Sequence, residues 1–140
     1  MNTANTLGLR RELSSTFDET LGNVAEALKI EGFGILTEVD VRETLKKKLG
    51  VDFRRYRILG ACNPPFAHEA LQADLEAGLS MPCNVVVYES DAGKTVVAAV
   101  DPTKTVAAAG NPKLSALAET LRQKLERVLE RLRQQRSRKS

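Results

Sequence analysis

The stretch "FRRYRILGACNPPFAHEAL", residues 53–71, contains the clearest change of local structure in this sequence. Its first part, 53–62, reads as a strand, because alternate residues fall on opposite faces of a pleated chain. One of those faces would carry Tyr56, Ile58, Gly60 and Cys62. Pro64 and Pro65 follow, and proline is tolerated in the first turn of a helix. The stretch therefore predicts a strand that turns directly into a helix after Cys62.

The rest of the chain continues this alternation of strands and helices. Apolar periodicity predicts further strands at 7–15, 33–39, 83–90 and 95–100, the last two joined by a hairpin turn at 91–94. Helices are expected after Thr16, after Asp40 and from about residue 112, and the first two carry capping patterns, with Glu19 and Glu43 three residues after the caps. Because helices between strands imply crossovers, we expect an α+β fold: two layers, with a mixed sheet of about five strands, helices mainly on one face, and a long C-terminal helix.

The C-terminal region differs from the rest of the chain in charge and in pattern. We divide the chain into an α+β domain at 1–112, with its core at about 9–102, and a C-terminal amphipathic helix with a basic tail at 113–140. Nine Lys/Arg and three Asp/Glu give residues 113–140 a charge of +6, against −3 for residues 1–112. The helix has a heptad of apolar residues, which suits either packing over the sheet or a dimer contact. The heptad positions are Leu114, Ala118, Leu121, Leu125, Val128 and Leu132.

Composition excludes several classes of protein. No apolar run approaches the roughly 20 residues of a transmembrane helix, and the N-terminus lacks the apolar region of a signal peptide. Two cysteines in such a chain argue for reduced thiols in the cytoplasm. Aromatic residues make up only 4% and none is interleaved with the basic tail, which argues against nucleic-acid binding. The phosphate-binding, dinucleotide-binding and serine-hydrolase motifs are absent, as is Cys-x-x-Cys.

Cys62 is the best candidate for chemistry. It ends a strand just before a helix whose N-cap we expect to be Asn63, and a helix N-terminus stabilises a thiolate or binds an anion. A small buried hydrophobic thiol would explain the same residue without any function. His68, the one histidine, follows six residues later and could act as its base or could face water.

Cys83 opens the next predicted strand. If the strands on either side of the helix were parallel, a helix of about 12 residues would carry the chain ~18 Å and leave the two sulfurs at opposite ends of the sheet. That geometry argues against a Cys62–Cys83 disulfide and against a metal site made by Cys62, His68 and Cys83. We therefore assign no metal ligand, and the sequence identifies no cofactor.

Three segments, "GFGILTEVDVRETL", "ILGACNPPFAHEAL" and "LSMPCNVVVYE", resemble in order and spacing the family catalogued as domain of unknown function 302. The resemblance covers roughly residues 9–102, with the C-terminal helix as a common addition. It implies a compact α+β domain, often a homodimer, in a bacterial or archaeal family that has no established reaction. The Cys-Asn-Pro and Pro-Cys pairs of the family map onto Cys62, Asn63, Pro64, Pro82 and Cys83, which implies that the two cysteine segments lie closer than the helix geometry suggests.

These observations predict a small cytoplasmic homodimer that binds a small molecule or anion near the Cys62–Asn63 turn. The candidate ligand-binding residues are Cys62, Asn63, Pro64, His68, Pro82 and Cys83. Two alternatives stay open: a thiol-dependent enzyme or redox sensor that uses Cys62, and a metal or haem binder that uses Cys62 and Cys83. Whether the protein is an enzyme is left undecided by the sequence.

Overall fold

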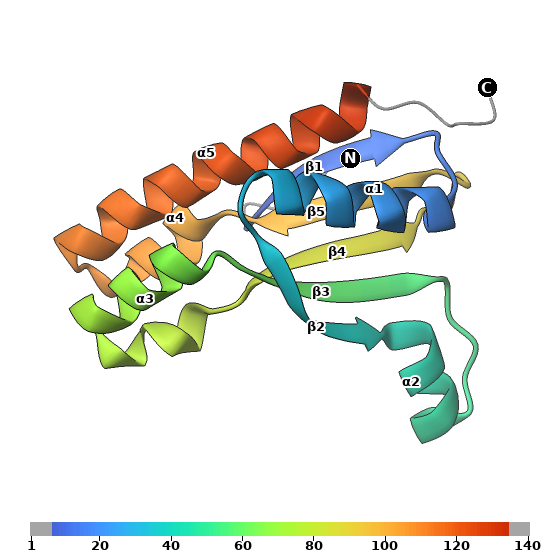
Figure 1. Ribbon diagram of the computed structural model, residues 1–140. Coiled ribbons are helices and arrows are strands. Elements are labelled where there is room, and N and C mark those ends of the chain that lie inside the picture. Colours follow the sequence, from blue (N-terminus) through green and yellow to red (C-terminus); the bar gives the residue numbers. More distant parts are fainter. Residues whose placement is uncertain (1–6, 135–140) are drawn as a thin grey trace.

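The structure is a computed structural model that describes residues 7–134 (Figure 1). The elements are, in chain order, β1 (Gly8–Leu13), α1 (Phe17–Ile30), β2 (Gly34–Asp40), α2 (Val41–Leu49), β3 (Tyr56–Cys62), α3 (Pro64–Ala73), the 3₁₀ helix η1 (Leu75–Ser80), β4 (Cys83–Glu89), β5 (Thr95–Val100), α4 (Pro102–Thr105), the 3₁₀ helix η2 (Val106–Ala109) and α5 (Pro112–Gln134). The α+β class, the five strands and the long C-terminal helix are thus confirmed.

The sheet is antiparallel throughout, so the expectation of a mixed sheet was wrong. The strand order is β1-β5-β4-β3-β2, and every pair of neighbours in the described chain runs antiparallel. The decisive pair is β3–β4, because the segment between them was expected to carry the chain to the far end of the sheet. Instead the chain leaves β3 and enters β4 at the same end.

The reason lies in how residues 63–82 are divided. A single helix of about 12 residues was expected here, but α3 ends at Ala73 and the chain reverses into η1. Asp74 makes the break: its backbone is extended, and its carboxylate accepts a hydrogen bond from the Glu76 N–H at 2.9 Å. Asp is a favoured N-cap residue, so this side chain starts the second, returning helix. The helix α3 therefore leads away from the sheet and η1 leads back.

One face of the sheet is covered by α1 and α5, which cross it side by side in Figure 1. The main core lies beneath them and includes Leu28, Leu59, Val85, Val97 and Leu125. The six heptad residues of α5 are all buried within this chain. The heptad therefore packs within this chain, and its residues are not free for a partner helix.

A second, smaller core lies at the end of the sheet where α3, η1, η2 and the start of α5 gather. Its buried members are Ala70, Ala77, Val106, Leu114 and Ala118. Satellite clusters of this kind form where connecting segments pack on one another instead of on the sheet. The boundary between this small core and the main core is where the candidate site lies.

Local signals in the sequence are confirmed at both predicted caps. Thr16 and Glu19 form a complete capping box at the start of α1, and the Asp40 carboxylate accepts from the Glu43 N–H at the start of α2. In the described part of the chain, no helix is both long and apolar enough to cross a membrane. The last residues of the basic tail, 135–140, lie outside the described residues.

The other face of the sheet is not covered by α1 or α5, and it carries a patch of apolar side chains. Alternation in the strands directs Val39, Ile58 and Val86 to this side, together with Tyr56 and Tyr88, whose rings stack at 5.2 Å. Antiparallel sheets with one solvated face normally show polar residues there. These five side chains therefore form an apolar patch that α1 and α5 leave uncovered.

Candidate binding pocket at the paired ends of two strands

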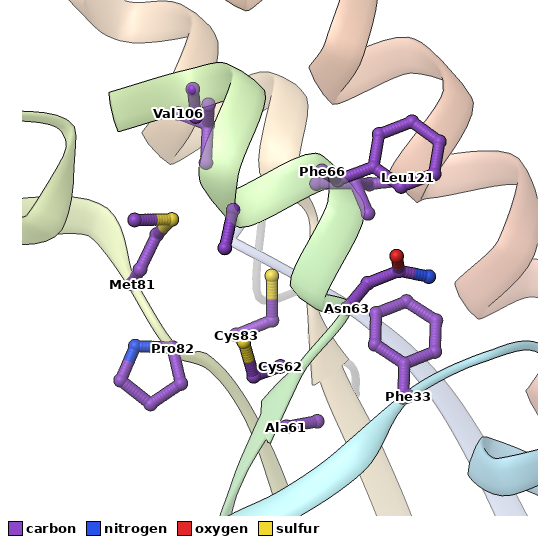
Figure 2. Close-up of a pocket in the computed structure, with 12 residues that line it drawn as sticks. Phe33, Ala61, Cys62, Asn63, Phe66, Met81, Pro82, Cys83, Val106 and Leu121 are labelled. Atoms are coloured by element: carbon purple, nitrogen blue, oxygen red, sulfur yellow. The ribbon is translucent and has the colours of Figure 1, made fainter. Parts of the chain in front are cut away.

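The two cysteine segments meet at one end of the β3–β4 pair. In the register of these strands Ala61 lies opposite Cys83, so Cys62 is the next residue beyond that pair (Figure 2). This overturns the argument that the sulfurs sit at opposite ends of the sheet, which assumed parallel strands. The proximity implied by the family resemblance was the correct expectation.

A small cavity lies between the strand ends, α3 and α5 (Figure 2). Its volume is about 30 Å³, where roughly 10–15 Å³ on the same measure holds one water molecule. The cavity joins the two cores, since Phe33, Phe66 and Leu121 come from around the main core, and Ala70, Met81 and Val106 from the smaller one. Almost every group on its wall is apolar, so it suits a ligand of very few heavy atoms.

Four of the six predicted site residues line this cavity: Cys62, Asn63, Pro82 and Cys83. The other two do not, because Pro64 and His68 are exposed on α3 and are absent from the wall. A Cys62–His68 catalytic pair and a Cys62–His68–Cys83 metal site therefore have no support in this geometry. Among the described residues, no group of three or more His, Cys, Asp or Glu side chains could hold a metal ion.

Both cysteines are free thiols, but their surroundings differ. Cys83 is 5% exposed, and burial, with a smaller contribution from nearby Cys62, raises the pKa of its thiol from 9.0 to about 11. Cys62 is half-buried. The thiol of Cys83 is thus protonated at neutral pH, and Cys62 is the more accessible of the two.

Asn63 occupies the N-cap position of α3 as predicted, but its side chain does not cap the helix. Its Nδ2 instead donates to the backbone oxygen of Glu31 at 3.4 Å, which ties the start of α3 to the end of α1. The Glu31 carboxylate is buried in turn and accepts from Arg127 at 3.0 Å. Asn63 thus links α3 to α1, a structural role that the local sequence did not predict.

The start of α3 is a poor anion site. A helix N-terminus binds anions through unpaired backbone N–H groups, and Pro64 and Pro65 have none. The N–H of Ala67 already donates to the backbone oxygen of Asn63 at 2.9 Å. Only Phe66 is left among the first helical residues to offer a donor, so the anion that the sequence suggested has little to bind.

Gly60 and Pro82 shape the wall from the open side of the sheet. A Cβ atom on Gly60 would lie 2.1 Å from the Thr37 hydroxyl oxygen and 2.8 Å from the Pro82 ring. Both separations are far shorter than van der Waals contact, so only glycine lets the Met81–Pro82 segment, whose peptide bond is cis, approach β3 this closely. The site thus depends on a residue that the sequence presented only as part of a strand.

The sequence offered few signals for the other wall residues. Phe33, Phe66, Ala70, Met81, Val106 and Leu121 come from five separate segments, and each reads as an ordinary core residue. Met81 alone had a local sign, since it stands beside the Pro82–Cys83 pair. Their convergence depends on the reversal at Asp74 and on the position of α5.

The fold and the pocket define a small α+β domain with an antiparallel sheet and two thiols at the paired ends of its central strands. The chain belongs to the family described as domain of unknown function DUF302, whose model matches residues 9–132. That match extends through most of α5, beyond the roughly 9–102 that the sequence resemblance covered.

A solved structure agrees with this assignment. The crystal structure of an uncharacterized conserved protein DUF302 from Bacillus stearothermophilus is 33% identical to this chain, with a TM-score of 0.84. The match covers 91% of this chain and 99% of that one. No curated protein matches the sequence. Family and fold are therefore shown, and neither name states a function.

Proposed function

We propose that this protein is a cytoplasmic, homodimeric binding domain whose ligand is small and occupies the cavity beside Cys62 and Cys83. The observation that carries the proposal is the convergence of both cysteine segments on one apolar cavity at the junction of two cores. Close-packed interiors rarely leave voids larger than a water molecule, and such voids are few in a domain. A cavity bordered by two free thiols is therefore the feature of this fold most suited to binding.

The chemistry of the wall limits the ligand. Nearly all the lining groups are apolar, and Pro64 and Pro65 remove donors that an anion would need. A volume of about 30 Å³ is also far below the ~300–1,000 Å³ of pockets for drug-sized ligands. A haem group is too large for the same reason. We therefore favour a ligand of one to a few atoms over an organic metabolite.

Xenon is a suitable neutral probe, because dry apolar cavities bind it without any specific contact. We expect xenon pressure to produce saturable shifts in the amide NMR signals of wall residues such as Ala61 and Ala67. Ala70→Leu should abolish these shifts by filling the cavity, whereas Ala116→Leu, on the exposed side of α5, should leave them unchanged. Shifts that are absent, or that survive Ala70→Leu, would contradict the pocket.

The second copy of the chain would pack on the open face of the sheet. Five strands of up to seven residues give a face of roughly 24 by 23 Å, comparable in scale with the ~800 Å² that each partner buries in a standard interface. The heptad residues of α5 are already buried and cannot form this interface, whereas Val39 on the open face is 43% exposed.

Light scattering tests the dimer. We expect about twice the monomer mass of 15.3 kDa. Val86→Lys, in the middle of the open face, should shift the protein to monomer, while the exposed Lys47→Glu on α2 should not. A monomeric wild-type protein would refute the dimer without affecting the pocket.

A further inference from the structure

We propose that the ligand of this pocket is a soft monovalent metal ion, copper(I), bound by the Sγ atoms of Cys62 and Cys83 with the Sδ atom of Met81 as third donor. This inference rests on the proposed function and names the class of ligand for the same cavity. It starts from the distribution of sulfur in the molecule. The chain has two cysteines and two methionines, and three of these four residues line this one cavity. The fourth is Met1, outside the described residues.

The fold brings the three sulfur residues together from two sides. Cys62 ends β3, while Met81 and Cys83 flank Pro82 at the start of β4, the strand paired with β3 (Figure 2). Cys62 lies one step beyond the Ala61–Cys83 pair, at the end of its strand, and Figure 2 shows the side chains of both cysteines close together beside the cavity that both line. Both thiols are free, which keeps them available as ligands instead of joined to each other.

The donor set selects the metal. Thiolate and thioether are soft ligands, and in proteins they favour copper(I) among the common metal ions. Zinc takes four ligands in structural sites, and no third His, Cys, Asp or Glu side chain joins the two thiols in the described structure. Calcium and magnesium require several oxygen ligands, and the lining side chains provide only the amide of Asn63. Two or three soft donors therefore match a metal that accepts low coordination.

The surroundings also match a single ion. The cavity of about 30 Å³ has room for one ion but not for an organic ligand. Its wall is almost entirely apolar, with Phe33, Phe66 and Val106, so few protein oxygen atoms compete for the metal. The two cysteines stand on the end of β3 and the start of its paired strand β4, which are more rigid supports than a loop.

Binding balances without any oxidant or reductant. Two neutral thiols and Cu⁺ give a bis-thiolate copper(I) complex and two protons, and copper keeps its oxidation state. The thioether adds a neutral donor and releases nothing. Two protons released per copper is thus a direct signature of the proposed site.

The test is an anaerobic titration of the full chain with copper(I) in competition with a chromogenic copper(I) chelator. We expect one copper per chain and two protons released. Mutation of residues that only hydrogen-bond to a metal ligand weakens metal binding by about 10–100-fold. Loss of a direct ligand should cost at least as much, so Cys62→Ser or Cys83→Ser should weaken copper binding by about 100-fold or more. Met81→Leu, which conserves volume and keeps the fold, should weaken it by about tenfold.

The matched control is His68→Ala, which removes a metal-binding side chain that is exposed on α3 and outside the pocket. It should bind copper as the wild type does. The inference is overturned if the wild type retains no copper, or if copper binding survives both serine variants or is lost in His68→Ala. A protein that binds xenon in this cavity but retains no copper would refute the metal and leave the proposed pocket standing.

Discussion

At one end of the β3–β4 pair the chain is rich in arginine, and at the other end it carries sulfur. Just before β3, Arg54 forms an ion pair with Asp91 at 2.7 Å, and Arg55 forms one with Asp18 at 2.6 Å. Within β3, Arg57 forms ion pairs with Glu38 and Asp40 of β2. At the far end of the same two strands, the side chains around Cys62 and Cys83 are apolar. The same pair of strands thus joins an ionic, exposed end to an apolar end that is more deeply buried.

The difference shows which end can tolerate change. The carboxylates of Asp18 and Asp91 are largely exposed, and surface ion pairs contribute a median of only about 0–1 kcal/mol. The sulfur end depends on close packing, where a single added carbon meets two neighbours. We therefore expect substitutions at the sulfur end to have much larger effects than substitutions at the ionic end.

The largest effect should come from Gly60→Ala. The new methyl group would lie 2.1 Å from the Thr37 hydroxyl and 2.8 Å from the Pro82 ring, and overpacking typically destabilises by 1–3 kcal/mol, so we expect a loss of about 3 kcal/mol. Urea denaturation measures this free energy of unfolding. Gly34→Ala is the matched control, because it lies in the neighbouring strand β2 and its added Cβ would meet nothing within 4 Å. Equal losses in the two variants would show that the wall is not tightly packed.

The second-largest effect should be a loss of stability at alkaline pH. The pKa of Cys83 is raised from 9.0 to about 11 in the folded protein, first by burial and then by Cys62, so the unfolded chain loses this proton first. Stability contributed by the protonated thiol is fully present below pH 9.0 and is lost as the pH rises toward 11. At 1.36 kcal/mol per unit, the loss is at most about 2–3 kcal/mol.

Comparison with Cys83→Ala isolates this contribution. Burial also raises the pKa of Tyr56, with a further contribution from Tyr88, so part of the alkaline loss belongs to the tyrosines. Between pH 9.0 and 11, the free energy of unfolding should therefore fall less steeply with pH for Cys83→Ala than for the wild type. Identical slopes would mean that the Cys83 thiol is not desolvated as the fold implies.

The smallest effect should come from Arg54→Ala at the ionic end. Its partner Asp91 is 92% exposed on its side chain, so the loss should be below about 1 kcal/mol and should shrink further in high salt. Thermal unfolding at low and high salt checks this. A loss as large as that of Gly60→Ala would remove the contrast between the two ends.

Much of the secondary structure followed from local sequence alone. Several signals depend only on contacts between residues that are close in sequence, so they could be interpreted without the rest of the chain. They are the capping patterns at Thr16 and Asp40, the turn at 91–94 and the prolines after Asn63. The cysteine segments were also identified as the candidate site, and four of the six residues chosen line the cavity. The α+β class followed from the order of these elements.

Only the tertiary structure decided how those elements pair. The chain reverses at Asp74 after α3 and returns to the same end of the sheet, so β3 and β4 are antiparallel and Cys62 lies near Cys83. Part of the cavity wall comes from Phe33, Val106 and Leu121, which are distant in sequence and carry no local mark of a site. Local hydrogen bonds determine where elements begin and end, whereas the contents of a pocket depend on long-range packing, which a single sequence pattern does not encode.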